Sequence, residues 1–242
     1  MITDARVTLP VAILAGGLAT RLRPLTDSIP KILVEVAGKP FAEHQIELLF
    51  SRGVHRIVYC LGYRGQQVRE VLGDGCRWGM RFDYVFDGPR LLGTGGALKQ
   101  AQQLLGEAFF VLYGDSYLPC DYAPIEAAFR SSGRSGLMTV FRNEGRWNRS
   151  NVVFENGRII CYNKQEQSPA MRHIDYGLGI LRTAVLDAYP SGVPFDLAQV
   201  YQDLLARDDL AGYEVTERFY EIGSPEGLKE LSAVLSSKSP QH

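Results

Sequence analysis

Short apolar runs alternate with segments of helical periodicity through residues 1–141 of the chain. The apolar runs are rich in aliphatic and aromatic residues, which favours buried strands, and they cover residues 11–14, 56–61, 80–86, 108–112 and 136–141. Between them, apolar positions recur with helical spacing in residues 41–52, 66–72, 92–105 and 125–130, and residues 32–36 are expected to form a brief extended segment. This alternation predicts an α/β fold of the Rossmann-like type, with three α/β/α layers and a mostly parallel central sheet. In such sheets ligands bind at the carboxyl ends of strands.

The pattern changes from about residue 142. Asn156-Gly157 separates two short apolar runs, and this dipeptide is the strongest short signal for a β-hairpin. Beyond it we expect a strand that continues as a helix, a helix, a late pair of strands and a closing helix capped by Ser224, at residues 180–188, 199–207, 213–215 with 219–222, and 225–235. One domain over residues 1–242 follows, with halves at 1–141 and 142–235 and a loose tail over 236–242.

Composition limits the classes of function. The chain has 242 residues, 45% of them apolar, which suits one large domain with a packed core. Its formal net charge of −1 gives no overall field that would attract nucleic acid or anionic lipid. The four cysteines form no C-x-x-C pair, and no apolar run approaches the roughly 18 residues that span a bilayer. Because Asp4 and Arg6 interrupt any signal-peptide core, we expect a cytoplasmic protein that binds neither nucleic acid nor membrane.

The segment after the first apolar run carries the most specific chemistry. Gly16 and Gly17 let the backbone turn tightly or pass close to a ligand, and Thr20, Arg21 and Lys31 follow shortly. A glycine turn with exposed N–H groups and clustered cations suits a polyphosphate. The segment is not a P-loop, because no Gly-Lys-Ser/Thr follows, and it lacks the Gly-x-Gly-x-x-Gly of a dinucleotide fingerprint. A structural turn with solvated cations is the remaining alternative.

The string Gly16-Gly17-x-x-Thr20-Arg21-Leu22-x-Pro24-Leu25-Thr26, followed by Pro30-Lys31, resembles the signature loop of the sugar-1-phosphate nucleotidyltransferases. The resemblance implies that the loop wraps the phosphates of a nucleoside triphosphate (NTP), with Arg21 and Lys31 as catalytic cations. It also implies nucleotide contacts from Leu14, Ala15, Gly16, Gly17, Thr20 and Arg21. Ala19 stands where the family usually has a third glycine, and we expect alanine to be tolerated there through a negative φ.

Nucleotidyl transfer brings two anionic reactants together, so positioning and charge neutralisation should dominate its catalysis. Asp115 follows a buried apolar run and matches the family's metal-binding Gly-Asp. The match implies Mg²⁺ as cofactor, with Asp115 as a catalytic metal ligand that also contacts the sugar phosphate. Glu221, in Glu221-Ile-Gly-Ser-Pro225, stands where the family has its second metal-binding aspartate, and it is the expected second ligand. The alternatives are an ordinary turn aspartate and an ordinary strand-end acid.

Three further segments resemble substrate-binding parts of the family. The glycine-rich segment Leu92-Gly93-Thr94-Gly95-Gly96 matches the loop that contacts the nucleobase, where glycine lets the base approach the main chain. Residues 175–179 resemble a sugar-contacting segment. The nucleobase pocket is also expected to include Gly62 and Tyr63, with core packing as the alternative for Tyr63. Sugar-phosphate contacts are expected from Lys164, its neighbour Asn163, Gly177 and Gly179, with a solvated lysine as the alternative for Lys164. The first half of the chain should thus bind nucleotide and the second half sugar phosphate.

The resemblance covers residues 11–231 and implies transfer of NMP from an NTP to a sugar 1-phosphate, with release of pyrophosphate. The chain resembles two short forms of the family, heptose-1-phosphate guanylyltransferases and N-acetylmuramate-1-phosphate uridylyltransferases. We expect GTP and D-glycero-D-manno-heptose 1-phosphate as substrates. The uridylyl pair, another hexose 1-phosphate and a phosphocholine-type cytidylyl transfer are alternatives. A non-catalytic nucleotide-sugar-binding regulatory protein is a further alternative, and a homodimer is the assembly that we consider.

Overall fold

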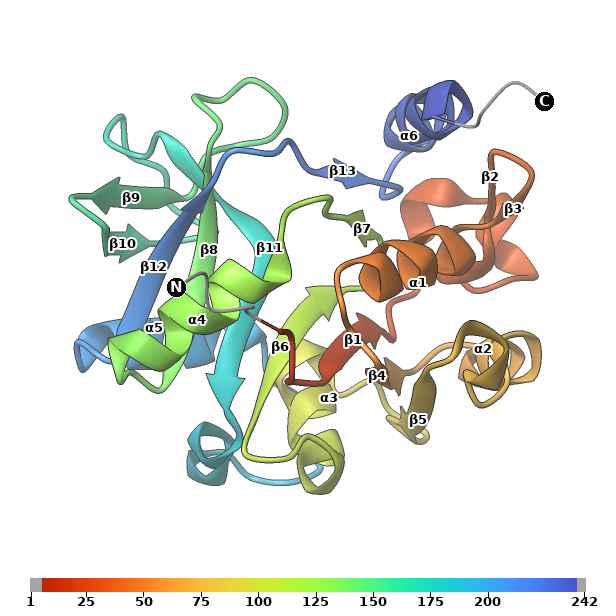
Figure 1. The fold of residues 1–242 in the computed structure, drawn as a ribbon, viewed down its shortest axis with the longest axis horizontal. Helices are drawn as coiled ribbons and strands as arrows, with labels where there is room; N and C mark the ends of the chain where they lie inside the picture. The colour runs from red at the N-terminus through yellow and green to blue at the C-terminus, as the bar shows by residue number, and fades with distance from the viewer. Residues whose placement is uncertain (1–5, 239–242) are drawn as a thin grey trace.

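The computed structural model describes residues 6–238. A nine-stranded sheet crosses the molecule in the order β10-β9-β11-β6-β1-β4-β5, and β8 pairs with β11 and with β12 outside this path (Figure 1). Its strands are β1 (Val11–Ala15), β4 (Arg56–Leu61), β5 (Arg81–Phe86), β6 (Ala108–Tyr113), β8 (Gly136–Arg142), β9 (Val152–Glu155), β10 (Arg158–Tyr162), β11 (His173–Arg182) and β12 (Leu210–Val215).

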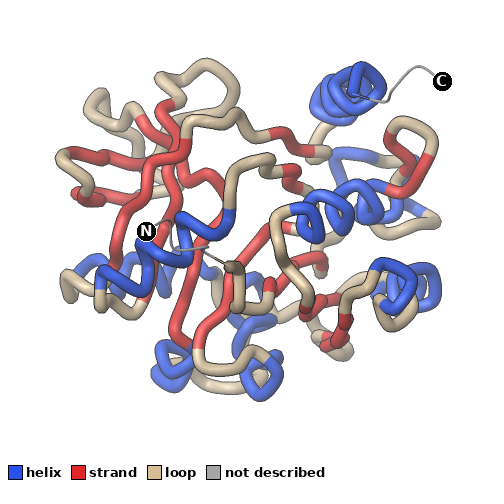
Figure 2. The backbone as a smooth tube through the Cα atoms, in the orientation of Figure 1, coloured by secondary structure: helices blue, strands red, loops and turns tan. Residues whose placement is uncertain are grey.

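Helices and two small sheets complete the fold (Figure 2). The α-helices are α1 (Phe41–Ser51), α2 (Gly65–Leu72), α3 (Gly93–Ala101), α4 (Tyr122–Ser132), α5 (Leu197–Ala206) and α6 (Pro225–Lys238). Short 3₁₀ helices lie at Thr20–Leu22, Leu25–Asp27, Lys31–Leu33, Cys76–Trp78, Gln102–Leu104 and Thr183–Ala188. The small sheets pair β2 (Glu35–Val36) with β3 (Lys39–Pro40), and β7 (Ser116–Tyr117) with β13 (Tyr220–Glu221). Among the described helices, none is both long and apolar enough to cross a membrane.

Alternate residues of each central strand face opposite layers of helices. Val11 and Ile13 of β1 pack with apolar residues of α1, α2, α4 and α6, whereas Ala12 and Leu14 pack with those of α3 and α5. All four side chains are buried, so β1 reads as a continuous apolar run, as strands covered on both faces do. The three-layer α/β/α prediction is therefore confirmed.

The sheet is parallel where the predicted nucleotide-binding half lies. β6, β1, β4 and β5 run in one direction, so that their carboxyl ends meet at one edge. β11 runs antiparallel to both β6 and β8, which makes the whole sheet mixed. The predicted hairpin is present as β9 and β10, joined through Asn156-Gly157. The ten-residue β11 pairs with β6 on one side and with the seven-residue β8 on the other, and so joins the second half of the chain to the first.

Three local predictions were wrong. The expected late strand pair does not form, because β12 pairs with β8 while β13 pairs with β7. Residues 32–36 are a 3₁₀ turn followed by a two-residue strand rather than one extended segment. Residues 236–238 continue α6 instead of starting a loose tail, and the rest of that predicted tail lies outside the described residues. Ser224 does cap α6, since its Oγ accepts a hydrogen bond from the backbone N–H of Gly227 at 3.1 Å.

Candidate active site

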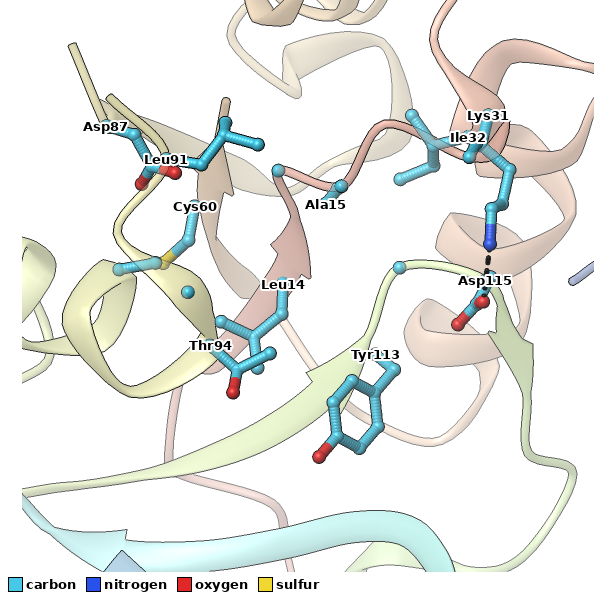
Figure 3. Close-up of a pocket in the computed structure, with 16 residues that line it drawn as sticks. Leu14, Ala15, Lys31, Ile32, Cys60, Asp87, Leu91, Thr94, Tyr113 and Asp115 are labelled. Atoms are coloured by element: carbon cyan, nitrogen blue, oxygen red, sulfur yellow. Dashed lines mark hydrogen bonds and ion pairs between the residues drawn. The ribbon is translucent and has the colours of Figure 1, made fainter. Parts of the chain in front are cut away.

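A cavity of about 260 Å³ lies at the carboxyl ends of β1, β4 and β6, beside the start of α3. Figure 3 shows Lys31 and Asp115 at one end of this cavity, Asp87 and Leu91 at the other, and Ala15 between them. Its lining comprises Leu14, Ala15, Gly16, Gly17, Ala19, Lys31, Ile32, Cys60, Asp87, Leu91, Gly93, Thr94, Ala97, Tyr113, Gly114 and Asp115. The signature loop, the glycine-rich segment and Gly114-Asp115 thus converge on one site, although long stretches of sequence separate them.

Close contact between two strand-end loops forms the floor of the cavity. The backbone N–H of Tyr63 donates to the carbonyl of Gly16 at 3.3 Å. A Cβ on Gly62 would lie 2.6 Å from that same carbonyl oxygen and 2.6 Å from Cδ2 of Leu91. Gly62 therefore permits the two loops to meet, and it lies beside the cavity rather than among its lining residues. Tyr63 is half-buried and lies under the guanidinium of Arg64, 5.2 Å from the ring centroid, outside the core.

Ala19 adopts the left-handed conformation, with φ 50° and ψ 40°. Our expectation of a negative φ was wrong, and the backbone shape explains why the family usually has glycine at this position. The carbonyl of Ala19 accepts hydrogen bonds from the Thr26 hydroxyl at 2.9 Å and from the Leu22 N–H at 3.1 Å. These two bonds hold the loop in the conformation that the alanine resists.

Cations and carboxylates meet at the Lys31 end of the cavity, where phosphate binding is expected and which we call the phosphate end. The Nζ of Lys31 donates to Oδ2 of Asp115 at 2.7 Å, and both side chains are largely shielded from solvent, at 20% and 27% exposure. A Cβ built on Gly223 would lie 3.2 Å from Nη2 of Arg21 and 3.6 Å from Oδ2 of Asp115. Arg21, Lys31 and Asp115 therefore lie around one point. Thr20 lies on the same 3₁₀ turn as Arg21, and both residues are exposed. Gly223 was not singled out from the sequence.

Strand pairing brings the backbone of Glu221 beside that of Asp115. β13 pairs with β7, and the N–H of Ile222 donates to the carbonyl of Asp115 at 2.9 Å, so the two acids lie on adjoining backbone segments. The Glu221 carboxylate accepts a hydrogen bond from Nδ2 of Asn148 at 3.3 Å. No group of three metal-binding side chains occurs within residues 6–238. Two carboxylates fit Mg²⁺, which usually takes one or two protein carboxylates and completes its shell with phosphate oxygens and water.

The other end of the cavity holds a carboxylate that the sequence reading missed. Oδ2 of Asp87 accepts a hydrogen bond from the backbone N–H of Leu92 at 3.1 Å. Within the described chain, no lysine or arginine forms an ion pair with Asp87. Burial raises the pKa of this carboxyl, opposed by the hydrogen bond from Leu92. Burial, together with Asp87, also raises the pKa of the neighbouring Cys60 thiol to about 12, so that thiol stays protonated.

The glycines of the 92–96 segment pack against residues 193–197. The N–H groups of Gly95 and Gly96 both donate to the carbonyl of Phe195, at 3.0 and 3.3 Å, and a Cβ on Gly95 would overlap the Phe195 ring. Thr94 accepts a hydrogen bond from the N–H of Leu197 at 2.8 Å. Gly93 and Thr94 line the cavity, whereas Gly95, Gly96 and Leu92 are buried behind it. The close approach that needs glycine here is between two protein segments.

Lys164 lies beside Tyr113, on the side of the cavity where the sugar phosphate is expected and which we call the acceptor side. Its Nζ is 3.4 Å from the hydroxyl of Tyr113, a lining residue, and 3.4 Å from the carboxylate of Asp196. The hydroxyl of Tyr162 donates to Oδ2 of Asp175 at 3.2 Å, and burial raises the pKa of Asp175 despite the hydrogen bond from the Gly177 N–H. These side chains form a polar cluster next to Tyr113. Of its members, only Lys164 and the 175–179 segment were predicted from the sequence.

Of the other residues predicted to contact the sugar phosphate, one lies beside the cavity and two have structural roles. Gly177 has φ 91°, and a Cβ there would lie 3.5 Å from Tyr113 and 3.6 Å from the Ser116 hydroxyl, which places it beside the cavity. The space beside Gly179 is filled by the hydroxyl of Tyr201. The side-chain carbonyl of Asn163 accepts hydrogen bonds from the backbone N–H groups of Gln165 and Glu166, at 2.8 and 3.0 Å, and so stabilises the local turn. Gly179 and Asn163 therefore have evident structural roles.

The sequence profile of the family described as "Nucleotidyl transferase" matches residues 11–156, which carry the signature loop, Asp87 and Asp115. The chain belongs to this family. Among curated relatives, the catalytic subunit beta of mannose-1-phosphate guanylyltransferase from Dictyostelium discoideum is 32% identical over 238 residues, which cover 95% of this chain. The chain spans 66% of the length of that relative.

Several solved structures share the fold of this chain. HddC from Yersinia pseudotuberculosis superposes with a TM-score of 0.78 at 26% identity, covering 94% of this chain and 100% of that chain. A second HddC structure, complexed with GMP-PN, gives a TM-score of 0.77. UDP-glucose pyrophosphorylase from Acinetobacter baumanii gives 0.76 at 17% identity, covering 97% of this chain and 95% of that chain, which shows a shared fold alone.

Proposed function

We propose that this protein is a sugar-1-phosphate nucleotidyltransferase that transfers NMP from an NTP to a sugar 1-phosphate and releases pyrophosphate. The observation that carries the proposal is the meeting of Arg21, Lys31 and Asp115 at one end of a cavity formed by the signature loop. In this reaction a phosphate oxygen of the sugar attacks the α-phosphorus of the NTP in line. A bond from that oxygen to the α-phosphorus forms, the α–β phosphoanhydride bond breaks, and pyrophosphate leaves.

The residues at the phosphate end neutralise and position these anionic groups. Arg21 offers a planar guanidinium that binds phosphate oxygens in pairs, and Lys31 adds a point charge already oriented by Asp115 at 2.7 Å. Such preorganised charges stabilise the charge that develops on the transferring phosphoryl group. Asp115 and Glu221 would hold Mg²⁺, which would supply positive charge to neutralise the phosphates. Lys164, 3.4 Å from Tyr113 on the acceptor side, would bind the sugar phosphate.

Asp87 favours guanine as the base. A carboxylate only accepts hydrogen bonds, and this one is partly buried with the Leu92 N–H as its hydrogen-bond donor. The Watson–Crick edge of guanine presents two adjacent donors, N1–H and the N2 amino group, which match the two oxygens of a carboxylate. Uracil and thymine present one N–H on that edge, and adenine and cytosine one amino group. GTP is therefore the donor that best compensates Asp87 for the water it loses.

The acceptor proposal rests on the relatives and on the family resemblance. The Dictyostelium relative is named for mannose 1-phosphate, and the segment Leu92-Gly-Thr-Gly-Gly of this chain resembles the heptose-1-phosphate guanylyltransferases. We therefore propose D-glycero-D-manno-heptose 1-phosphate first, and mannose 1-phosphate second. Both sugars carry the same reacting phosphate, so they use the same residues at the phosphate end.

The test is pyrophosphate release with Mg²⁺, measured for five nucleoside triphosphates against a panel of sugar and alcohol 1-phosphates. We expect release with GTP and one of the two named sugars, and loss of release on removal of Mg²⁺ by EDTA. Asp115→Asn and Arg21→Ala should reduce kcat at least about 100-fold, as loss of a transition-state contact does. Absence of release with every pair, from protein that still binds nucleotide, would contradict the proposed activity.

The base assignment has a separate test. Asp87→Asn should raise the KM for GTP about 10- to 100-fold, because a hydrogen bond to a charged group contributes about 1.5–3 kcal/mol. The KM for the sugar phosphate should stay within twofold. Asp187→Asn, an exposed aspartate outside the cavity, is the matched control and should leave both values unchanged. A higher turnover of the wild-type protein with UTP than with GTP would contradict the guanine assignment.

A further inference from the structure

A second cavity, of about 820 Å³, lies between the 143–150 loop and the 165–172 loop. The first loop joins β8 to β9, and the second joins β10 to β11. The proposed reaction uses none of its lining residues. The two loops are tied together, because Nε2 of Gln167 donates to the carbonyl of Ser150 at 3.2 Å and the N–H of Asn143 donates to the carbonyl of Arg172 at 3.1 Å. The lining side chains used below are Glu144, Trp147, Asn148, Arg149, Gln167 and Arg172.

The charge around this cavity is positive. Glu144, the one acid that lines it, accepts from Arg142 at 3.0 Å through one oxygen and from Arg146 at 3.1 Å through the other. Arg149 and Arg172 also line the cavity, and neither forms a side-chain ion pair or hydrogen bond within residues 6–238. An unpaired guanidinium presents its donors in a planar fork that matches a carboxylate or phosphate. Two of them in one cavity favour an oxyanion.

The rest of the lining suits a carbohydrate. Trp147 is 40% exposed although it is a large aromatic residue. The Arg218 guanidinium lies 4.4 Å from its ring centroid and so supports the ring. The C–H face of a sugar ring packs on an exposed indole, while amides such as those of Asn148 and Gln167 bond its hydroxyl groups. An aromatic ring, amides and free guanidiniums together match a polar ring that bears an acidic group.

We propose that this cavity binds a carbohydrate that carries an oxyanion, either a carboxylate or a phosphate. The cavity adjoins the proposed active site, because the Asn148 amide donates to the Glu221 carboxylate at 3.3 Å. The acceptors proposed above carry no oxyanion other than the reacting phosphate, so the ligand of the second cavity is a separate sugar anion.

Intrinsic fluorescence gives a direct test, because Trp147 lines the cavity and the chain has only two tryptophans. In a Trp78→Phe background, glucose 6-phosphate and glucuronate are titrated, with neutral glucose as the comparison. We expect a saturable change with the two anionic sugars, and a Kd at least tenfold weaker in Arg149→Gln and in Arg172→Gln. Arg146→Gln, which removes a guanidinium already paired to Glu144, is the matched control and should leave the Kd within twofold.

A further arm locates the bound sugar. The titration is repeated with the first cavity filled by GTP and Mg²⁺, without any acceptor. Unchanged binding would assign the anionic sugar to the second cavity, and loss of binding would assign it to the first cavity and overturn the proposal. No saturable change with either anionic sugar, or equal binding of neutral glucose, would overturn the proposal. The titrations involve no turnover, so their failure is distinct from failure of the proposed enzymatic activity.

Discussion

Replacing Gly95 by alanine tests why the 92–96 segment is rich in glycine. In an open helical position this change would stabilise the protein by about 1 kcal/mol, since alanine is the better helix former. At Gly95 the added methyl would overlap the Phe195 ring, with Cζ of the ring 3.1 Å away. Cε2 and Cδ2 of the ring lie closer still, so the ring would have to move by roughly 1.5 Å to restore a normal carbon–carbon contact of about 3.5–4.0 Å.

The surroundings of Phe195 resist that movement. Its ring stacks on Tyr189 with centroids 4.7 Å apart, and its backbone carbonyl accepts the N–H groups of Gly95 and Gly96. Overpacking of this kind costs about 1–3 kcal/mol. For a domain of this size each kcal/mol lowers Tm by about 2–4 °C, so calorimetry should show a decrease of several degrees. Gly17→Ala is the control, because a methyl there would meet nothing within 4 Å.

A double variant identifies the contact responsible. Adding Phe195→Leu to Gly95→Ala should recover part of the lost stability, with a coupling energy of about 0.5–3 kcal/mol. If instead Gly95→Ala left Tm unchanged and raised the KM for GTP, the glycine would serve approach of the base, and our packing explanation would be refuted.

Three further outcomes follow from the site. Ala19→Gly should raise the free energy of unfolding by about 0.5–1 kcal/mol in urea titrations, since it removes a left-handed alanine at some cost in chain entropy. A lower urea midpoint would contradict the left-handed φ of 50°. Lys31→Met should lower the free energy of unfolding by less than about 1 kcal/mol, as the loss of a partly exposed ion pair does. It should nevertheless lower kcat about 100-fold. If the loss of kcat matched the fraction of unfolded protein in the sample, the result would argue against a catalytic role. Burial raises the folded-state pKa of Asp87 above its unfolded-state pKa, so the free energy of unfolding decreases as the pH rises from the unfolded-state pKa to the folded-state pKa. Asp87→Asn should reduce this dependence of stability on pH and raise the Tm of the unliganded protein at pH 7. An unchanged pH dependence would count against the burial argument.

The sequence by itself determined the layers of the fold and the phosphate end of the site. The apolar run at residues 11–14 is local, and its lack of alternation already indicates a strand covered on both faces. Arg21 and Lys31 lie within one short segment, and Asp115 follows a strand whose carboxyl end had to meet the same sheet edge. For these residues, local pattern and parallel topology suffice.

Only the tertiary structure decided the features that depend on contact between distant segments. Asp87 precedes the glycine-rich segment without any motif of its own, and it became a candidate base reader only because β5 places it beside the loop after β1. β13 carries an ordinary two-residue pattern, so its pairing with β7 and the resulting position of Glu221 could not be read locally. Gly95 is glycine because of Phe195, a hundred residues later. The left-handed backbone conformation of Ala19 likewise depends on packing that no single segment encodes. The same holds for the position of Arg149 and Arg172 in one cavity.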